Sequence, residues 1–337
     1  MLLALLQAGC AQKPPVYGPE TATIRAALAQ GADPNQEFNG WRPLNYNVAF
    51  SHPSSQKGIS AEGWLLNVEL LLKAGADPNA PALGVSRLGM TPLAWAVRQC
   101  RAEMVRLLLA NGADPYQPYY REHADLGTYL TVMVSPGTDP FCQTVDEERS
   151  LAFVLLDHIE RTRGRAAMLD FVRTDPPGAY MPTLHNAALR GYYGVLAALI
   201  EKRVDLDQMA QVSSLNREWT ALHLAEALGR ADIADALRRG GARDDIRSNR
   251  GETPASVRGS LMQDSASVEL GRMATQIVRQ DVVGFLKEAN RDEVWRMSMA
   301  SGRQGVKMPP PGWTGLEDAI RKAQAAREAE SRPAGTR

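Results

Sequence analysis

Hydrophobic positions recur along the chain in short clusters, and several of these clusters end shortly before a glycine. The run from Met104 to Leu109 precedes Gly112, and the run from Val68 to Leu72 precedes Gly75. The spacing of the apolar residues is typical of helices that are buried on one face. The glycine supplies the left-handed residue that commonly follows a helix. The pattern therefore predicts short amphipathic helices separated by tight turns.

Two short motifs accompany these predicted helices. The first motif, Gly-Ala-Asp-Pro, begins at Gly31, Gly75 and Gly112. The second motif is related to Thr-Pro-Leu-His, and its anchor residues are Leu44, Leu93, Leu184, Leu222 and Ala255. The anchors are 49, 91, 38 and 33 residues apart, as expected for a repeat of about 33 residues with insertions. The proline opens the next helix, where its missing N–H costs nothing.

These motifs resemble the ankyrin repeat over roughly residues 20 to 260. The resemblance implies an all-α ankyrin-repeat solenoid of helix-turn-helix units with irregular insertions. It also implies that His185 and His223 hydrogen-bond between turns, a structural role and not a catalytic one. Because a single repeat buries no core of its own, stacking between neighbouring repeats supplies the stability.

The repeat spacing divides the chain into an array and a C-terminal part. We expect the array over 20–290, with insertions at 51–63 and 117–178. The second insertion holds an apolar helical stretch from Leu151 through Phe171, which can complete a degenerate repeat. Residues 291–337 are expected to form a linker and a short charged helix with a disordered end.

The first ten residues form a short apolar run that ends in small residues and Cys10. This run resembles a bacterial lipoprotein signal over 1–9, in which Cys10 becomes the lipidated N-terminus, followed by a linker over 10–19. Gln7 and the absence of a preceding Lys or Arg depart from that pattern. The resemblance implies a lipid-anchored protein on the periplasmic side of the bacterial envelope, at the outer membrane. A cytoplasmic protein that begins with an ordinary helix, and a plain secretory signal, are the alternatives.

Composition narrows the possible chemistry. The 38 Lys and Arg residues balance 38 Asp and Glu residues, which argues against a nucleic-acid partner. No apolar run approaches the roughly 18 residues that cross a bilayer. Three Cys and five scattered His show no metal-ligand spacing, and no phosphate loop or nucleophile motif occurs. We therefore expect no enzyme activity, no cofactor, no metal site and no small-molecule substrate.

Repeat scaffolds present extended surfaces to other proteins, so the expected partner is another protein. The residue before each Thr-Pro equivalent lies at a turn tip on the concave side, and Arg98, Gln99 and Arg190 end inner helices on that side. Tyr119 and Tyr120 add aromatic recognition chemistry in a loop. The candidate contact residues at the turn tips are Trp41, Met90, Met181 and Trp219. The alternative is that the two Trp side chains pack beneath neighbouring loops, and the two Tyr side chains over adjacent convex helices.

We interpret the chain as a protein-binding module that acts through the concave surface and the inserted loops. A periplasmic immunity-type inhibitor that occludes a toxic enzyme and a passive structural scaffold are the alternatives. Lipidation of Cys10 would leave Cys100 and Cys142 as the other thiols, and an oxidising compartment would favour a disulfide between them. Two unrelated thiols, with Cys100 buried as a small apolar residue, are the alternative.

Overall fold

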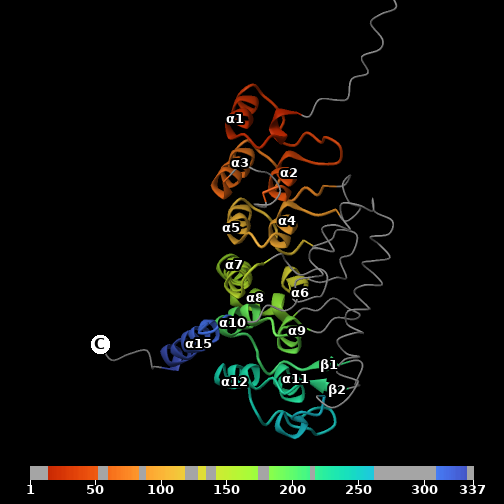
Figure 1. The fold of residues 1–337 in the computed structure, drawn as a ribbon, viewed down its shortest axis with the longest axis vertical. Coiled ribbons are helices and arrows are strands. Elements are labelled where there is room, and N and C mark those ends of the chain that lie inside the picture. Colours follow the sequence, from red (N-terminus) through yellow and green to blue (C-terminus); the bar gives the residue numbers. More distant parts are fainter. Residues whose placement is uncertain are drawn as a thin grey trace, which may run out of the picture.

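The computed structural model describes residues 14–51, 60–82, 89–117, 128–133, 142–173, 182–212, 217–261 and 309–331. Its helices form two columns that run the length of an elongated stack (Figure 1). The outer column consists of α1 (Thr21–Ala29), α3 (Ala61–Lys73), α5 (Ala102–Ala110), α7 (Val145–Arg163), α10 (Tyr193–Glu201) and α12 (Ala231–Arg239). The inner column consists of α2 (Pro43–Ala49), α4 (Pro92–Arg98), α6 (Tyr129–Met133), α9 (Thr183–Arg190) and α11 (Ala221–Ala227).

Along much of the stack, a helix packs on the next helix of the same column. Among the inner helices, α2 contacts α4 and α9 contacts α11, while the outer helices α3, α5, α7 and α10 contact one another in turn. The strands described are the short β1 (Ala210–Val212) and β2 (Arg217–Trp219), which pair antiparallel as a hairpin before α11. The predicted all-α solenoid of stacked helix pairs is confirmed.

Local sequence explains where the helices begin and end. Thr91 caps α4 by accepting a hydrogen bond from the Ala94 amide, and Pro92 fills the first helical position. Thr220 caps α11 in the same way, through the amide of His223. After α5, Gly112 has a φ of +87°, a conformation that is strained for any residue with a side chain. The motifs that mark the repeat therefore have direct conformational roles.

The segment expected as a linker before the array is packed where the structure describes it. The 3-10 helix η1 (Pro15–Tyr17) places Val16 and Tyr17 in the core at 0% and 1% exposure. The Asn47 side chain donates to the Val16 carbonyl, and the Asn67 side chain donates to the Pro19 carbonyl. These bonds hold the segment against the first helices, so the array begins before residue 20.

The two expected insertions are partly helical. Helix α3 begins at Ala61, inside the first one. The second contains α6, α7 and α8 (Arg165–Arg173), and α7 packs between α5 and α10 as an outer helix of the stack. Gly164, with a φ of +86°, ends α7 and separates it from α8. The apolar stretch from Leu151 is therefore divided into two helices, and the first of them, α7, is part of the stack.

The C-terminal helix α15 (Gly315–Ser331) lies against the outer side of α10 and α12 (Figure 1). It buries Ala319, Ile320 and Ala323 on one face. On its charged side Lys322 pairs with Glu201 at 2.6 Å. The helix is thus longer than predicted and is part of the packed structure. The 3-10 helix η4 (Ala255–Val257) follows the last outer helix, and the other elements expected over 262–308 lie outside the described residues.

The inner helices are buried more completely than an open concave face would allow. All residues of α4 and α11, and Thr183–Leu189 of α9, are buried. Helix α2 is different, since Tyr46, Ala49 and the following Phe50 are only partly buried. Within the described residues, the accessible part of the inner side is therefore concentrated around α2.

Candidate functional site

A cluster of aromatic side chains occupies the inner side of the second and third repeats. Trp41 lies at its centre, and its ring centroid is 5.9 Å from Tyr46, 5.4 Å from Phe50 and 5.6 Å from Trp95. Tyr46 and Phe50 are themselves 4.4 Å apart. We call Trp41, Tyr46, Phe50 and Trp95 the aromatic cluster. Trp95 is buried, whereas the other three members are half-buried.

Of the predicted contact residues, Trp41 is the one that the structure places in this cluster. Its turn is fixed by a bridge to Phe38 and by a hydrogen bond of 2.7 Å from the Tyr17 hydroxyl to the Trp41 carbonyl. The turn is therefore fixed, and the ring contacts three aromatic neighbours while part of its surface stays accessible. A rigid aromatic side chain of this kind is a frequent energetic centre of protein interfaces.

Met90 and Trp219 occupy the equivalent turn tips but are buried, at 2% and 0% exposure. The Trp219 indole donates to Glu252 at 3.1 Å and stacks on His223, 6.1 Å away. The Met90 carbonyl accepts a hydrogen bond from Asn45. Both residues therefore join neighbouring repeats, which corrects the expectation of an exposed stripe and agrees with the alternative of packing for Trp219.

Arg98 and Gln99 do not form an exposed polar rim, because their exposures are 7% and 8%. Gln99 connects two repeats, since its amide oxygen accepts from Ser51 at 3.2 Å and its amide nitrogen donates to the Ala49 carbonyl. Arg190 is half-buried at the end of α9. The remaining predicted residues lie outside the described part of the chain: Cys10, Tyr119, Tyr120 and Met181.

Cys100 and Cys142 are joined by a disulfide in the structure, with their Cα atoms 4.9 Å apart. Cys100 follows α4 with a φ of +54°, a conformation more usual for glycine. Cys142 is 1% exposed and lies two residues before Thr144, which caps α7. The bridge therefore connects an inner helix of the third repeat to the start of α7.

Sequence reasoning did not identify Tyr46, Phe50 and Trp95 as members of a site. A signal was present, because Tyr46 and Trp95 both lie two residues after the Leu anchor of their repeats, at Leu44 and Leu93. Equivalent positions in adjacent repeats stack on each other, so aromatic residues at both of them can meet. Whether that side is open to solvent depends on other segments.

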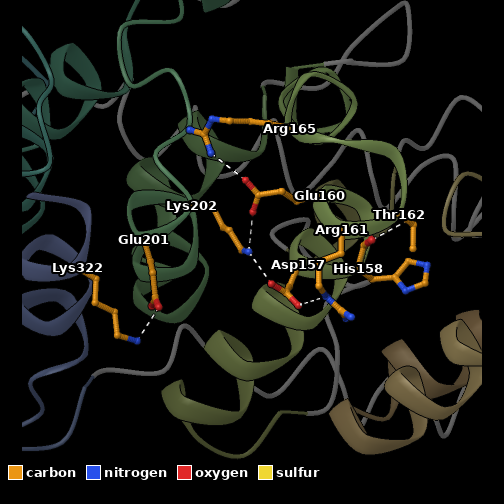
Figure 2. A network of polar contacts seen from close by, with 9 residues as sticks. All are labelled: Asp157, His158, Glu160, Arg161, Thr162, Arg165, Glu201, Lys202 and Lys322. Carbon is orange, nitrogen blue, oxygen red and sulfur yellow. Dashed lines mark hydrogen bonds and ion pairs between the residues drawn. The ribbon is translucent and has the colours of Figure 1, made fainter. Parts of the chain in front are cut away.

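A network of ionisable side chains lies between α7 and α10 (Figure 2). Lys202 donates to Asp157 and to Glu160, each at 2.8 Å, and its ammonium group lies 4.5 Å from the centroid of the Phe153 ring. Burial alone would raise the pKa of Asp157, but hydrogen bonds from Lys202 and Arg161 hold it below its usual value. Charged and paired carboxylates of this kind are poor proton donors at neutral pH, so the group is a structural connection between two helices.

Other kinds of site were sought among the described residues. No group of three or more His, Cys, Asp or Glu side chains there has an arrangement that could hold a metal ion. In the same part of the chain, no helix has the length and hydropathy of a membrane span.

Comparison with known sequences identifies repeats in the N-terminal part. Residues 16–118 match the family model for ankyrin repeats in three copies, so the repeats predicted there are ankyrin repeats and the stack has the ankyrin fold. Ankyrin repeat proteins of known function are protein-interaction modules. A search of curated proteins found no match.

Three solved structures that resemble this chain are ankyrin repeat proteins of low sequence identity. The human ASB11 ankyrin repeat domain has 18% identity and a TM-score of 0.43, covering 76% of this chain and 93% of that one. The ankyrin repeat domain of Bcl-3 has 18% identity and a TM-score of 0.44, covering 78% and 99%. EF0377, an ankyrin repeat protein, has 16% identity and a TM-score of 0.30, covering 79% and 94%.

Proposed function

We propose that this chain is a protein-binding module of the bacterial envelope and that its partner contacts the aromatic cluster. The observation that carries the proposal is the position of Trp41, Tyr46 and Phe50, half-buried and in mutual contact on the accessible part of the inner side. Aromatic side chains held rigidly at the centre of a surface lose little entropy on binding and bury much area. This cluster replaces the stripe of turn-tip residues that the sequence suggested.

The envelope setting is supported by the disulfide between Cys100 and Cys142, since such bonds persist in oxidising compartments and are rare in the cytosol. We propose lipidation of Cys10 as the anchor, on the resemblance of the first residues to a lipoprotein signal. Metabolic labelling with palmitate tests the anchor separately. Label in the wild type that is lost in Cys10→Ser is expected, and equal label in both proteins would contradict it.

Affinity capture from native envelope tests the binding site. The full chain, Trp41→Ala and the exposed α8 variant Arg173→Ala serve as baits, and proteins recovered by the first bait are identified by mass spectrometry. For the partner found, Trp41→Ala should weaken binding roughly thirtyfold, since truncation of an interface hot spot costs about 2 kcal/mol. Arg173→Ala should bind as the wild type does.

Because Trp41 also packs inside the protein, the folded fraction of the Trp41→Ala variant is measured by circular dichroism. The affinity is then expressed per folded molecule. Unchanged affinity of folded Trp41→Ala would place the contact elsewhere. The nature of the captured partner separates the narrower roles: an enzyme blocked at a one-to-one ratio would identify an immunity-type inhibitor. Simultaneous binding of several partners, all of which remain active, would identify a scaffold.

A further inference from the structure

The outer side of the stack contains a groove of about 800 Å³ that crosses α3, α5 and α7. Its apolar lining includes Leu65, Leu66, Leu107 and Phe153. Leu66 is 39% exposed, and it is one of two large hydrophobic side chains that are exposed among the described residues. The groove lies on the column of outer helices and is therefore separate from the aromatic cluster on the inner side (Figure 1).

All three helices contribute charged residues to the groove, and on the middle helix α5 Glu103 and Arg106 pair with each other. On the α3 side are Glu62 and Glu69, and Glu62 makes no ion pair with any described residue. On the α7 side are Arg161, His158 and Asp157, and Asp157 is already paired with Arg161 and Lys202. The α3 side therefore offers free negative charge, while the α7 side does not.

The same outer side already holds one amphipathic helix further along the stack. Helix α15 lies on α10 and α12 with Ala319, Ile320 and Ala323 buried. Its charged residues pair with the outer column at both ends, Glu317 with Arg239 and Glu330 with Arg203. The outer helices of this protein can thus bind a helix through an apolar strip with charges on either side.

The groove differs from the seat of α15 in having no described helix on it. Outer helices spaced 8–10 Å apart give a length of about 20 Å across three of them, which about 13 helical residues would cover. Apolar side chains from all three helices, with charges on α3 and α7 and the mutually paired Glu103 and Arg106 between them, fit a helix that inserts apolar residues at positions i, i+3, i+4 and i+7.

We propose that this outer groove binds one amphipathic α-helix of a partner protein. The apolar stripe of that helix packs on Leu65, Leu66, Leu107 and Phe153. Lys or Arg at the end over α3 pairs with Glu62, and Asp or Glu at the end over α7 faces Arg161. The site is additional to the aromatic cluster, so the chain can contact a partner on both sides of the stack.

Three synthetic helical peptides of 14 residues test the proposal on the full chain by fluorescence anisotropy. All carry the same leucine stripe. One has Lys at one end and Glu at the other, the second has Lys at both ends, and the third has Glu at both ends. The peptide with both signs should bind at least tenfold more tightly than the peptide with Glu at both ends, since Glu62 repels the latter.

Variants of the protein then locate the binding. Leu66→Asp should weaken binding of the mixed-charge peptide at least tenfold, because it places a charge in the apolar floor. Tyr116→Asp changes the other exposed large hydrophobic residue, which does not line the groove, and should bind the peptide as the wild type does. The wild type should prefer the peptide with Lys at both ends to the peptide with Glu at both ends. Glu62→Lys should reverse that preference.

Several outcomes would overturn the proposal. Equal affinity for all three peptides, or equal loss in Leu66→Asp and Tyr116→Asp, would show that the groove does not select a helix by shape and charge. Sedimentation of the protein without peptide provides a further check. A dimer that is abolished by Leu66→Asp would mean that a second copy of this chain occupies the groove instead.

Discussion

The backbone N–H of Gly194 donates a hydrogen bond of 3.2 Å to Oε2 of Glu148, where α10 packs on α7. A Cβ atom at residue 194 would stand 2.7 Å from the backbone nitrogen of Arg149 and 2.8 Å from that same Oε2. These distances are shorter than van der Waals contact, and one of the neighbours is rigid backbone. Helices α7 and α10 therefore pack closely because residue 194 has no side chain.

Gly194→Ala should lower the free energy of unfolding by about 1–3 kcal/mol, since the two helices must separate to admit the methyl group. Urea denaturation followed by circular dichroism measures the change. Gly63→Ala is a matched control in the first turn of α3, where the better helix propensity of alanine should leave stability unchanged or slightly higher. Equal stability of Gly194→Ala and the wild type would mean that α10 can shift without cost.

The disulfide between Cys100 and Cys142 spans a sequence separation of 42 residues. In the double variant Cys100→Ser/Cys142→Ser the denatured chain is no longer constrained by a loop of that length. Its free energy of unfolding should therefore be lower than that of the wild type by up to about 4 kcal/mol. A reducing agent should lower the melting temperature of the wild type and leave that of the double variant unchanged. Titration of denatured, non-reduced protein from the envelope should find neither thiol free; two reactive thiols would exclude the bridge.

His185 is completely buried, and its Nε2 atom lies 2.8 Å from the Trp219 carbonyl, while Nδ1 has no hydrogen-bond partner. Burial lowers the pKa of His185 to about 4, against the opposing effect of the Trp219 carbonyl. The unfolded chain therefore binds a proton at this side chain between about pH 6.5 and 4 that the folded chain does not. The contribution of His185 to the free energy of unfolding is therefore fully present above about pH 6.5 and decreases as the pH is lowered toward about 4.

This one side chain should lower the free energy of unfolding by on the order of 3 kcal/mol between pH 6.5 and 4. His185→Gln removes the titration while keeping a hydrogen-bond donor. The variant should be less stable than the wild type at pH 7, and the difference should narrow as the pH falls to 4. Chemical denaturation at four pH values measures this, and a difference that stays constant would contradict a neutral His185.

Lys202 is 9% exposed and connects Asp157 and Glu160 across α7 and α10, whereas Lys73 is 69% exposed and pairs with Glu69 on the surface. Lys202→Met should lower the free energy of unfolding by about 2 kcal/mol, since hydrogen bonds to charged groups contribute that much when partly buried. Lys73→Met should change it by less than about 0.5 kcal/mol.

The pH dependence of Lys202→Met provides a second measurement. The folded pKa of Asp157 and that of Glu160 lie below their usual values: burial opposes this shift and the hydrogen bonds from Lys202 cause it. The stabilisation is therefore present above the unfolded pKa of about 4 and is lost as the pH falls through the lower folded values. The difference between wild type and Lys202→Met should shrink below pH 4, and persistence of the full difference there would argue against the ion pairs as its source.

The sequence was sufficient to predict the repeat, because the residues of the repeat motifs determine the backbone conformation locally. Thr91 and Pro92 begin a helix and Gly112 follows one through their own backbone conformations, whatever the neighbouring repeats are. The apolar spacing likewise determines which face of each helix is buried. Stacked helix pairs could therefore be predicted without any knowledge of contacts between distant residues.

The candidate site could be predicted only in part. Trp41, Met90 and Trp219 occupy the same position of their repeats, yet Trp41 is half-buried in an aromatic cluster while the other two are buried. Their difference comes from residues far along the chain, as when Trp219 donates to Glu252 and the Met90 carbonyl accepts from Asn45. The pattern within a repeat contains no information about these neighbours.

The sequence by itself thus determined the helices, their turns and the direction of their buried faces, since these depend on backbone conformation and hydrophobic spacing over a few residues. Only the tertiary structure decided that α7 completes the stack, that α15 covers α10 and α12, and that the groove across α3, α5 and α7 carries no described helix. The physical reason is that exposure is set by what packs on a surface from elsewhere in the chain. Those contacts join residues such as Glu201 and Lys322, 121 positions apart, which no local pattern connects.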